Sequence, residues 1–374
     1  MSCSIVQYYT LLTPSPNNHN LSVTSALSAS LRCKRTVTRC TVLDPIIHGW
    51  SIRHGGAKIS TMNESPDEAR ATALRELPPL MPQFLRKRRM GLPAAKEIAD
   101  SLGLERPHVF ALLLLRLVTG SYGGGPVSPG QVRAWDPYAT RHNYAEPFSA
   151  LAARGLVLED EQGNFSLSPT GTEAVERLHE AGRAFVVAHK PLPSDDLETM
   201  SGLLESAVQT TLEDPVLSPR PGSHLAGSRS LHTFGHDAPA MVRIEQAIYD
   251  LWHARDDAHV KAWRDAGLEG PAMHVFSPIW SGEVNTVQEL AARLGLEEST
   301  GDVESRLVCL VDSEYLEVDG EQLRLTPAGA LVREDIEHET DRIYLASWSL
   351  SLEQIEWLRD HLRQLVDNLP VTPL

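Results

Sequence analysis

The stretch LSPTGTEAVERLHEAGRAFVVAHKPLPSDDLETMSGLLESAV, residues 167–208, decides the fold, because it recurs without a gap at residues 325–366. The second copy reads LTPAGALVREDIEHETDRIYLASWSLSLEQIEWLRDHLRQLV. Each copy begins with the end of a predicted strand and a Ser/Thr-Pro-x-Gly corner, and continues into two predicted helices. The identical positions of the first copy are Leu167, Pro169, Gly171, Glu176, Ala188, Leu192, Glu198, Leu204 and Val208. A duplication on this scale predicts two domains of one architecture.

The length and composition agree with two folded domains. The chain has 374 residues, of which 42% are hydrophobic, so each half can bury a core. The formal charge of -15 argues against nonspecific binding of nucleic acid by the surface as a whole, because that binding needs phosphates to be neutralised. The four cysteines have no metal-ligand spacing and indicate a reducing, cytoplasmic location. No apolar run is long enough to span a membrane.

Residues 1–61 differ in composition from the rest of the chain. Six basic residues stand there against one acid, Asp44, among many Ser, Thr and Asn residues. One interpretation is a transit-type targeting peptide, and the other is a disordered extension or translated sequence upstream of a true start at Met62. We therefore exclude this segment from the fold prediction.

The first domain is predicted over residues 62–210. Residues 94–102 and 109–118 have helical spacing, and Ser128 is expected to cap a short helix that has Pro129 in its first turn. A further helix is predicted from Tyr138 to Gly155. Alternating apolar residues then predict a hairpin around residues 160–163, followed by the repeated helices.

Residues 211–240 are rich in Pro, Ser, Gly and His and are predicted to be a linker without a regular element. The second domain, residues 241–374, opens with a predicted helix over 241–266, which Gly267 and Gly270-Pro271 should end. Thr286 and Glu289 have the spacing of a capping box at the start of a short helix. Asp319-Gly320 between alternating residues predicts a second hairpin.

In these segments both halves resemble MarR-like winged helix-turn-helix domains. The residues that carry the resemblance are VNTVQELAARLGL (284–296), LVDSEYLEV (310–318) and LRLTPAGALV (323–332), and SALAARGLVLEDEQGNFSLSPTGTEAV (149–175) in the first half. Residues 254–271 resemble the helix that precedes such domains in tandem proteins of actinobacterial type. The fold class that the resemblance implies is mainly α, with two tandem winged-helix domains, each a helix-turn-helix plus a β-hairpin wing.

In such domains the helix before the wing enters the major groove of double-stranded DNA, and the wing touches the neighbouring backbone. The resemblance places these reading helices at residues 138–154 and 301–313. It implies a DNA-binding set made up of Thr140, Arg141, His142, Asn143, Tyr144, Arg154, Gln162 and Asn164. Arg and Asn are able to pair bidentately with guanine and adenine.

Two features depart from the family pattern. Pro147 falls inside the first reading helix, so either the helix is strained or it begins at Glu146 and leaves residues 141–144 in a loop. The second reading helix and wing carry four acids, Asp302, Glu304, Asp319 and Glu321, answered by Arg306 and Arg324. Acids facing phosphates repel them, and we therefore expect the second copy to be a poor DNA reader.

Other patterns have two interpretations each. The run Arg86 to Arg89 is either a phosphate-contacting arm or a solvated helix face. Residues with metal-ligating side chains at helical spacing suggest either a metal site or a charge-paired surface; they are His253, Asp256, Asp257 and His259. A group of four aromatic residues and one methionine suggests either a pocket for a small-molecule effector or part of the core; it comprises Trp252, Trp263, Trp280, Phe276 and Met273.

The sequence contains no nucleophile elbow, phosphate-binding loop or GxGxxG motif, so we predict no enzyme, no cofactor and no metal. The leading hypothesis is a transcriptional regulator whose first domain contacts DNA. The second domain would then be its pseudo-dimer partner or a sensor, or two chains would pair as a homodimer. The alternative is a winged-helix module that binds a protein or a small ligand and does not bind DNA.

Overall fold

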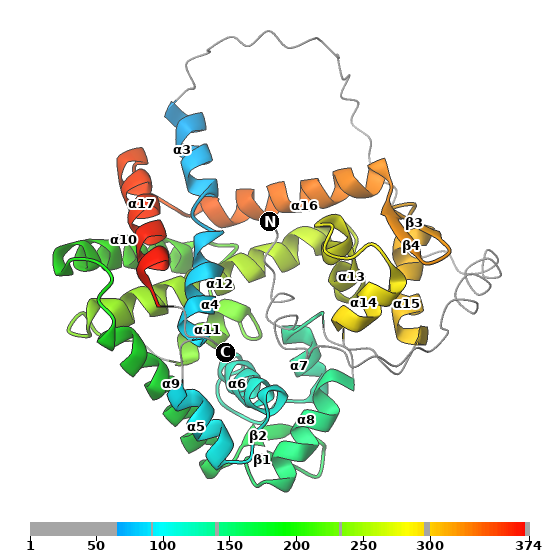
Figure 1. The fold of residues 1–374 in the computed structure, drawn as a ribbon, viewed down its shortest axis with the longest axis horizontal. Helices are drawn as coiled ribbons and strands as arrows, with labels where there is room; N and C mark the ends of the chain where they lie inside the picture. The colour runs from blue at the N-terminus through cyan, green and yellow to red at the C-terminus, as the bar shows by residue number, and fades with distance from the viewer. Residues whose placement is uncertain (1–65, 91–92, 139–141, 232–233, 295–299, 371–374) are drawn as a thin grey trace.

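The computed structural model describes residues 66–90, 93–138, 142–231, 234–294 and 300–370, and the chain there is mainly helical (Figure 1). The N-terminal segment 1–61 lies outside these residues. The only sheets in the described residues are two antiparallel hairpins, β1–β2 and β3–β4. The expectation of a mainly α protein is therefore confirmed.

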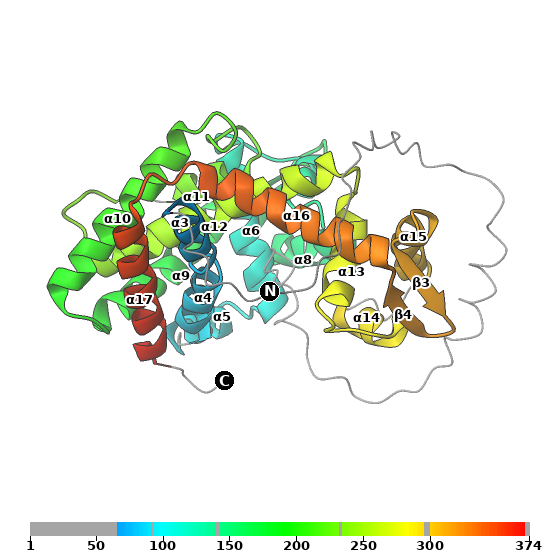
Figure 2. The same ribbon diagram turned by 90° about the horizontal axis from the view of Figure 1, so that it is seen from above.

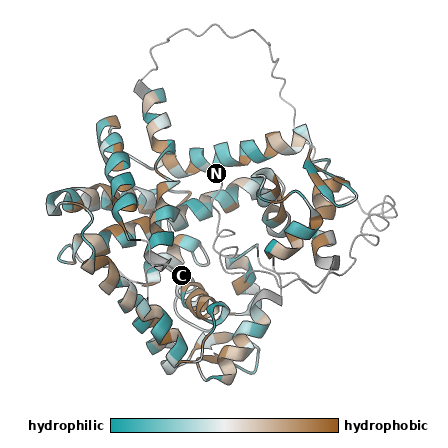
Figure 3. Cartoon of the chain, in the orientation of Figure 1, coloured by the Kyte–Doolittle hydropathy of each residue, from teal (hydrophilic) through white to brown (hydrophobic). Residues whose placement is uncertain are grey.

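The first half contains a compact group of three helices and a hairpin. Its members are α6 (Arg106–Ser121), α7 (Pro129–Trp135), α8 (His142–Ala153), β1 (Val157–Glu159) and β2 (Phe165–Leu167). Val127, just before α7, makes an isolated bridge to Phe165 of β2. We call this group unit 1. Helix α6 is strongly hydrophobic along much of its length (Figure 3). It packs against α8 and supplies much of the unit's core.

The same order of elements recurs in the second half as unit 2. Its members are α13 (Gly270–Trp280), α14 (Val287–Leu294), α15 (Thr300–Asp312), β3 (Leu316–Asp319) and β4 (Gln322–Leu325). Thr286, just before α14, makes the isolated bridge to Gln322 of β4. Thr286 and Glu289 also form the predicted capping box, with both hydrogen bonds at 3.1 Å. Gly320, at the tip of the second hairpin, has the positive φ that this turn requires.

The repeated corner has one geometry in both copies. The Ser168 hydroxyl accepts the Gly171 N–H at 2.9 Å, and the Thr326 hydroxyl accepts the Gly329 N–H at the same distance. A side chain at Gly171 would place Cβ 2.0 Å from the Leu156 carbonyl oxygen, and one at Gly329 would place it 2.1 Å from the Tyr315 carbonyl oxygen. The identical glycines of the repeat are therefore required by the close approach of the following helix to the first hairpin strand.

Long helices join the two units. Helices α9 (Pro169–Ala188) and α10 (Ser194–Glu213) follow unit 1, and α16 (Pro327–Ala346) and α17 (Leu352–Asn368) follow unit 2. The 26-residue helix α12 (Ala240–Asp265) lies against α10 and α16. At the N-terminus of the described chain, α3 (Pro66–Arg75), α4 (Leu80–Met90) and α5 (Pro93–Ser101) pack on these helices; unit 2 lies at the opposite end of the molecule from α10 and α17 (Figure 2).

The buried apolar residues form three clusters. One lies inside unit 1, and one fills unit 2 together with the C-terminal part of α12. The third and largest draws on α3, α4, α9, α10, α12, α16 and α17, so residues from both sides of the predicted linker share it. The division at residues 211–240 stays a prediction.

Two local predictions are wrong. The segment 211–240 contains a helix, α11 (His224–Leu231), whose first residues are buried against α6 and α12. Its first two amides, from His224 and Leu225, donate to the carboxylate of Asp257 on α12, so a distant side chain caps it. In addition, α8 begins at His142 and not at Tyr138, which lies in a buried turn.

Candidate nucleic-acid interface

Helix α8 of unit 1 corresponds to the predicted reading helix, and α7 precedes it. Ser128 caps α7 as expected: its hydroxyl accepts the Gln131 N–H at 3.2 Å, and its own N–H donates to the Gln131 side-chain oxygen at 2.8 Å. Pro147 lies in the second turn of α8, where it cannot donate to the carbonyl four residues earlier. The helix nevertheless extends back to His142, so the loop over residues 141–144 that an α8 start at Glu146 would require is not observed for the described part of that range.

The predicted DNA-binding residues fall into three groups. Thr140 and Arg141 lie outside the described residues. His142 and Asn143 form the first turn of α8, but the structure does not describe their side chains. Arg154 and Gln162 are exposed, and Asn164 is half-buried.

Tyr144 lies inside the protein. Its side chain is only 6% exposed, stacks on Phe148 and donates a hydrogen bond to the fully buried carboxylate of Asp136. The other oxygen of Asp136 accepts the Tyr138 N–H at 3.2 Å. Tyr144 therefore anchors α8 to the turn that precedes it, and we do not include it in the proposed DNA-facing surface.

The first wing is shaped by Asp160. Its carboxylate accepts the backbone N–H groups of Gln162 and Asn164 at 2.9 and 2.8 Å and the Asn164 side-chain amide at 2.9 Å. These hydrogen bonds lower the pKa of Asp160, so the carboxylate stays ionised. Together with exposed Glu159 and Glu161 it makes the tip of this wing acidic.

Arg306, on the second reading helix, is buried, unlike the exposed Arg154 at the end of the first. Arg306 on α15 is 4% exposed and donates to Nδ1 of His274 on α13 at 2.8 Å. We had expected Arg306 to answer the acids of unit 2 at the surface, and the structure places it in the interior; the side chains of two of those acids, Asp302 and Glu304, are not described. Burial and the charge of Arg306 lower the pKa of His274 to about 3, so its ring is neutral and Nδ1 is free of a proton and can accept.

The basic run on α4 is partly structural. Lys87 donates to the carbonyl oxygen of Val366 at 2.6 Å, near the C-terminal end of α17, where a cation is favourable. Arg86 is exposed, and the side chains of residues 88–90 are not described. The phosphate-arm interpretation therefore remains a prediction for Arg86 alone among the described side chains.

The polar residues predicted on the surface of α12 are buried instead. His253, Asp256 and His259 are each less than 5% exposed. Within the described part of the chain, no group of three or more His, Cys, Asp or Glu side chains is placed to hold a metal ion. Asp257 accepts a hydrogen bond at 2.8 Å from Nδ1 of His224, besides capping α11.

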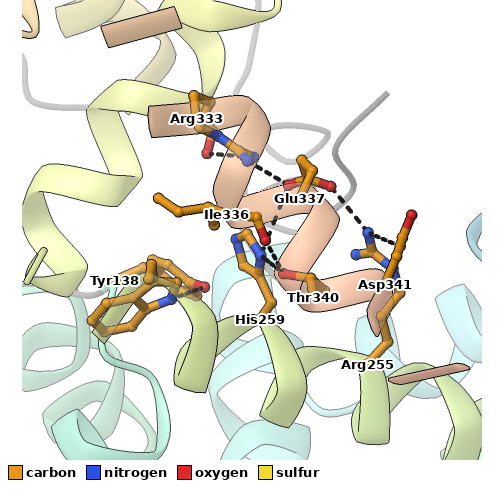
Figure 4. A network of polar contacts seen from close by, with 10 residues as sticks. Tyr138, Arg255, His259, Arg333, Ile336, Glu337, Thr340 and Asp341 are labelled. Carbon is orange, nitrogen blue, oxygen red and sulfur yellow. Dashed lines mark hydrogen bonds and ion pairs between the residues drawn. The ribbon is translucent and has the colours of Figure 1, made fainter. Parts of the chain in front are cut away.

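A buried ionic network fills the interface between α12 and α16 (Figure 4). Glu337 pairs with Arg333, which is fully buried, and with Arg255 at 3.1 Å. Burial alone would raise the pKa of Glu337, but Arg333, His259 and Arg255 together hold it well below its usual range. His259 contacts the Thr340 hydroxyl at 3.0 Å, and burial lowers its pKa to about 3.

The aromatic group divides between core and a surface hollow. Trp252, Trp263, Phe276 and Met273 are buried, as the core interpretation expects. Trp280 is half-buried and, with the edge of Trp252, lines a hollow of about 290 Å³ between the α3–α4 turn, α12 and α16. Arg255, Glu337 and Asp341 provide the polar part of its wall, so the ionic network extends to this hollow.

Comparison with known proteins identifies part of this architecture. Residues 230–371 match the model of a helix-turn-helix family, and this match supports a helix-turn-helix protein. The matched segment runs from the end of α11 through unit 2 to α17, and unit 1 lies outside it. A search of curated proteins and a search of solved structures each gave no match. Among the described helices, none has both the length and the apolar character needed to cross a membrane.

Proposed function

We propose that the protein is a cytoplasmic, DNA-binding transcriptional regulator made of two tandem MarR-like winged-helix domains, over residues 62–210 and 241–374. Units 1 and 2 are the winged helices of these domains. The helix-turn-helix family match over unit 2 and the equivalent order of elements in unit 1 support this assignment. In the proposal, unit 1 contacts DNA, and unit 2 is its partner within the chain.

The contrast between Arg154 and Arg306 is the observation that carries this division of roles. Arg154 is exposed at the end of α8, where its side chain donates to the Ala150 carbonyl at 2.8 Å and its charge remains in solvent. Arg306 is buried against His274. Phosphate binding needs accessible cations; the arginine at the end of α8 is accessible, whereas the arginine within α15 is buried.

Further side chains of unit 1 extend the proposed contact surface. Arg133 is exposed near the end of α7, the helix that crosses the DNA backbone in helix-turn-helix proteins. Gln162 and Asn164 lie on the wing, with His142 and Asn143 at the start of α8. The hollow beside Trp280 is where we place a small-molecule effector, if the second domain is a sensor.

Fluorescence anisotropy with labelled genomic fragments tests this proposal over a salt series. We expect some fragments to bind at low salt. The logarithm of the binding constant should then fall linearly with the logarithm of the salt concentration, with a slope of about 0.9 for each of a few phosphate contacts. Absence of binding at low salt, or binding that does not change with salt, would contradict DNA recognition.

The acidic wings favour a second candidate, a winged-helix module that binds a partner protein. Exposed acids occupy both hairpins: Glu159, Asp160 and Glu161 on the first, and Glu317 and Asp319 on the second. They repel phosphates and suit a basic protein surface. A chain that retains no DNA fragment but binds a basic protein in a salt-dependent manner would support this candidate.

A further inference from the structure

The turn between α7 and α8 leaves the core of its own unit. Tyr138 is 2% exposed and belongs to the apolar cluster of unit 2, not to that of unit 1. Its hydroxyl accepts a hydrogen bond at 3.1 Å from Nε1 of Trp263 on α12, and its ring lies 6.0 Å from that of Trp263 and 6.4 Å from that of His274. Tyr138, in the turn between α7 and α8, is thus held by the second half of the chain (Figure 4).

The backbones of the two units also approach each other closely beside Tyr138, at Gly270 and Pro137. Gly270 is the first residue of α13, and a side chain there would place Cβ 1.9 Å from the carbonyl oxygen of Pro137. No side chain fits at that distance without moving either the turn or α13. The sequence GP at 270–271 therefore does more than begin a helix, because its glycine lets unit 1 and unit 2 touch through their backbones.

A chain of buried hydrogen bonds continues from this contact to both reading helices. Arg306 of α15 donates to His274, and His274 in turn is hydrogen-bonded to the backbone of Tyr138. Since Nδ1 accepts from Arg306, the other ring nitrogen carries the proton and donates. The Tyr138 N–H then donates to Asp136, which also accepts from Tyr144 of α8.

We propose that Tyr138 is a positioning residue through which unit 2 sets the placement of α8. The consequence for DNA recognition rests on the function proposed above, but the mechanical link does not. Helix α8 has particular need of such an anchor, because Pro147 removes one hydrogen bond from its second turn. Unit 2 thus serves unit 1 as a scaffold. A change at Arg306 of α15 would reach α8 through His274, the backbone of Tyr138, and the side chains of Asp136 and Tyr144.

Hydrogen exchange of the full-length chain without DNA tests the link. The Gly270→Ala variant forces the Pro137 carbonyl away, and Tyr138→Phe removes only the acceptor of the Trp263 N–H. Gly202→Ala is the matched control, because Gly202 lies in α10 with nothing within 4 Å of an added Cβ. We expect exchange in α8 to accelerate about tenfold in Gly270→Ala and less in Tyr138→Phe, while α10 keeps its protection in both variants and the control leaves exchange in α8 as in wild type.

Two results would overturn the link. One is unchanged exchange in α8 in both variants, and the other is an equal acceleration in α8 and α10, which indicates general loss of stability. If Gly270→Ala does not fold, the test rests on Tyr138→Phe alone, and unchanged exchange in α8 of that variant would overturn the link. DNA affinity, measured in parallel, separates the two proposals: a wild-type chain that binds no DNA refutes the function and leaves the exchange result intact. Bound DNA with unchanged exchange refutes the link only.

Discussion

Asp256 is the least satisfied charged residue among the described side chains of α12. It is 2% exposed, and neither carboxylate oxygen has a hydrogen-bond partner. Burial raises its pKa to about 7, with Asp257 and Asp136 adding to the effect and His224 and Arg255 opposing it. Because its pKa lies near neutral pH, the carboxyl changes charge within the physiological range, unlike the carboxylate of a surface ion pair.

This shift predicts a pH-dependent contribution to stability. The folded-state pKa lies above the model value of 3.8, so the contribution is complete below about pH 4 and is lost as pH rises through about 7. The unfolding free energy of Asp256→Asn, relative to that of wild type, should therefore rise by on the order of 4 kcal/mol between pH 4 and pH 8. Urea denaturation at several pH values measures the difference, and a constant difference would contradict the assignment.

His259 and His274 act in the opposite direction. Their pKa values are lowered to about 3, so their contributions are complete above pH 6.5 and are lost as pH falls. The variant and wild type share both histidines, so the contributions of His259 and His274 cancel in the comparison of the two proteins.

Residue burial was only partly predictable from the sequence. Tyr144, Phe148 and Leu151 have the i, i+4, i+7 spacing of a buried helix face, so the sequence did contain a signal that Tyr144 faces inward. Asp136 and Arg306 had no such signal, because their partners, Tyr144 and His274, are defined by the tertiary fold. A polar residue on an expected reading helix can face either way, and only packing decides.

Among the elements, the α12–α16 pair depends on its ionic network. Glu337 neutralises two buried arginines, Arg333 and Arg255, at this interface. Replacing it removes the carboxylate that both arginines share and leaves Arg255 with Asp341 at 3.8 Å, which costs far more than the loss of an exposed pair.

We therefore expect Glu337→Gln to lower the unfolding free energy by roughly 3–5 kcal/mol. Asp100→Asn is the control, since the Lys96–Asp100 pair on α5 has side chains that are 77% and 62% exposed, and its loss should change the unfolding free energy little. Thermal and urea unfolding compare the two, and equal effects would mean that the network contributes no more than a surface pair.

Elements with local signals were predicted well, and those without were missed. The Ser128 cap and the Thr286 capping box each lie within a few residues of what they stabilise, and both are present. The second hairpin is present too, but its turn residues are Gly320 and Glu321, one position later than predicted, because Asp319 pairs with Gln322 in the strands. Helix α11 is capped by Asp257, over thirty residues away, within a Pro- and Gly-rich segment. No local rule could have indicated it.

At the scale of the whole molecule, the repeat predicts two similar units but not how they join. The largest apolar cluster combines helices from both ends of the described chain, and the turn at Tyr138 crosses from one unit into the other. These contacts bring together residues more than a hundred positions apart, and the duplicated sequence carries no record of them, because the two copies use different residues there.

The central claim, that unit 1 and not unit 2 contacts DNA, is tested most directly by one pair of matched variants. Arg154 at the end of α8 and Arg324 on β4 are both exposed arginines, one in each unit. Affinity for a retained genomic fragment would be measured over a salt series for Arg154→Gln and Arg324→Gln. We predict that Arg154→Gln weakens binding about three- to tenfold and reduces the salt slope by about 1, whereas Arg324→Gln stays within about twofold of wild type. The reverse order, or equal losses, would contradict the account.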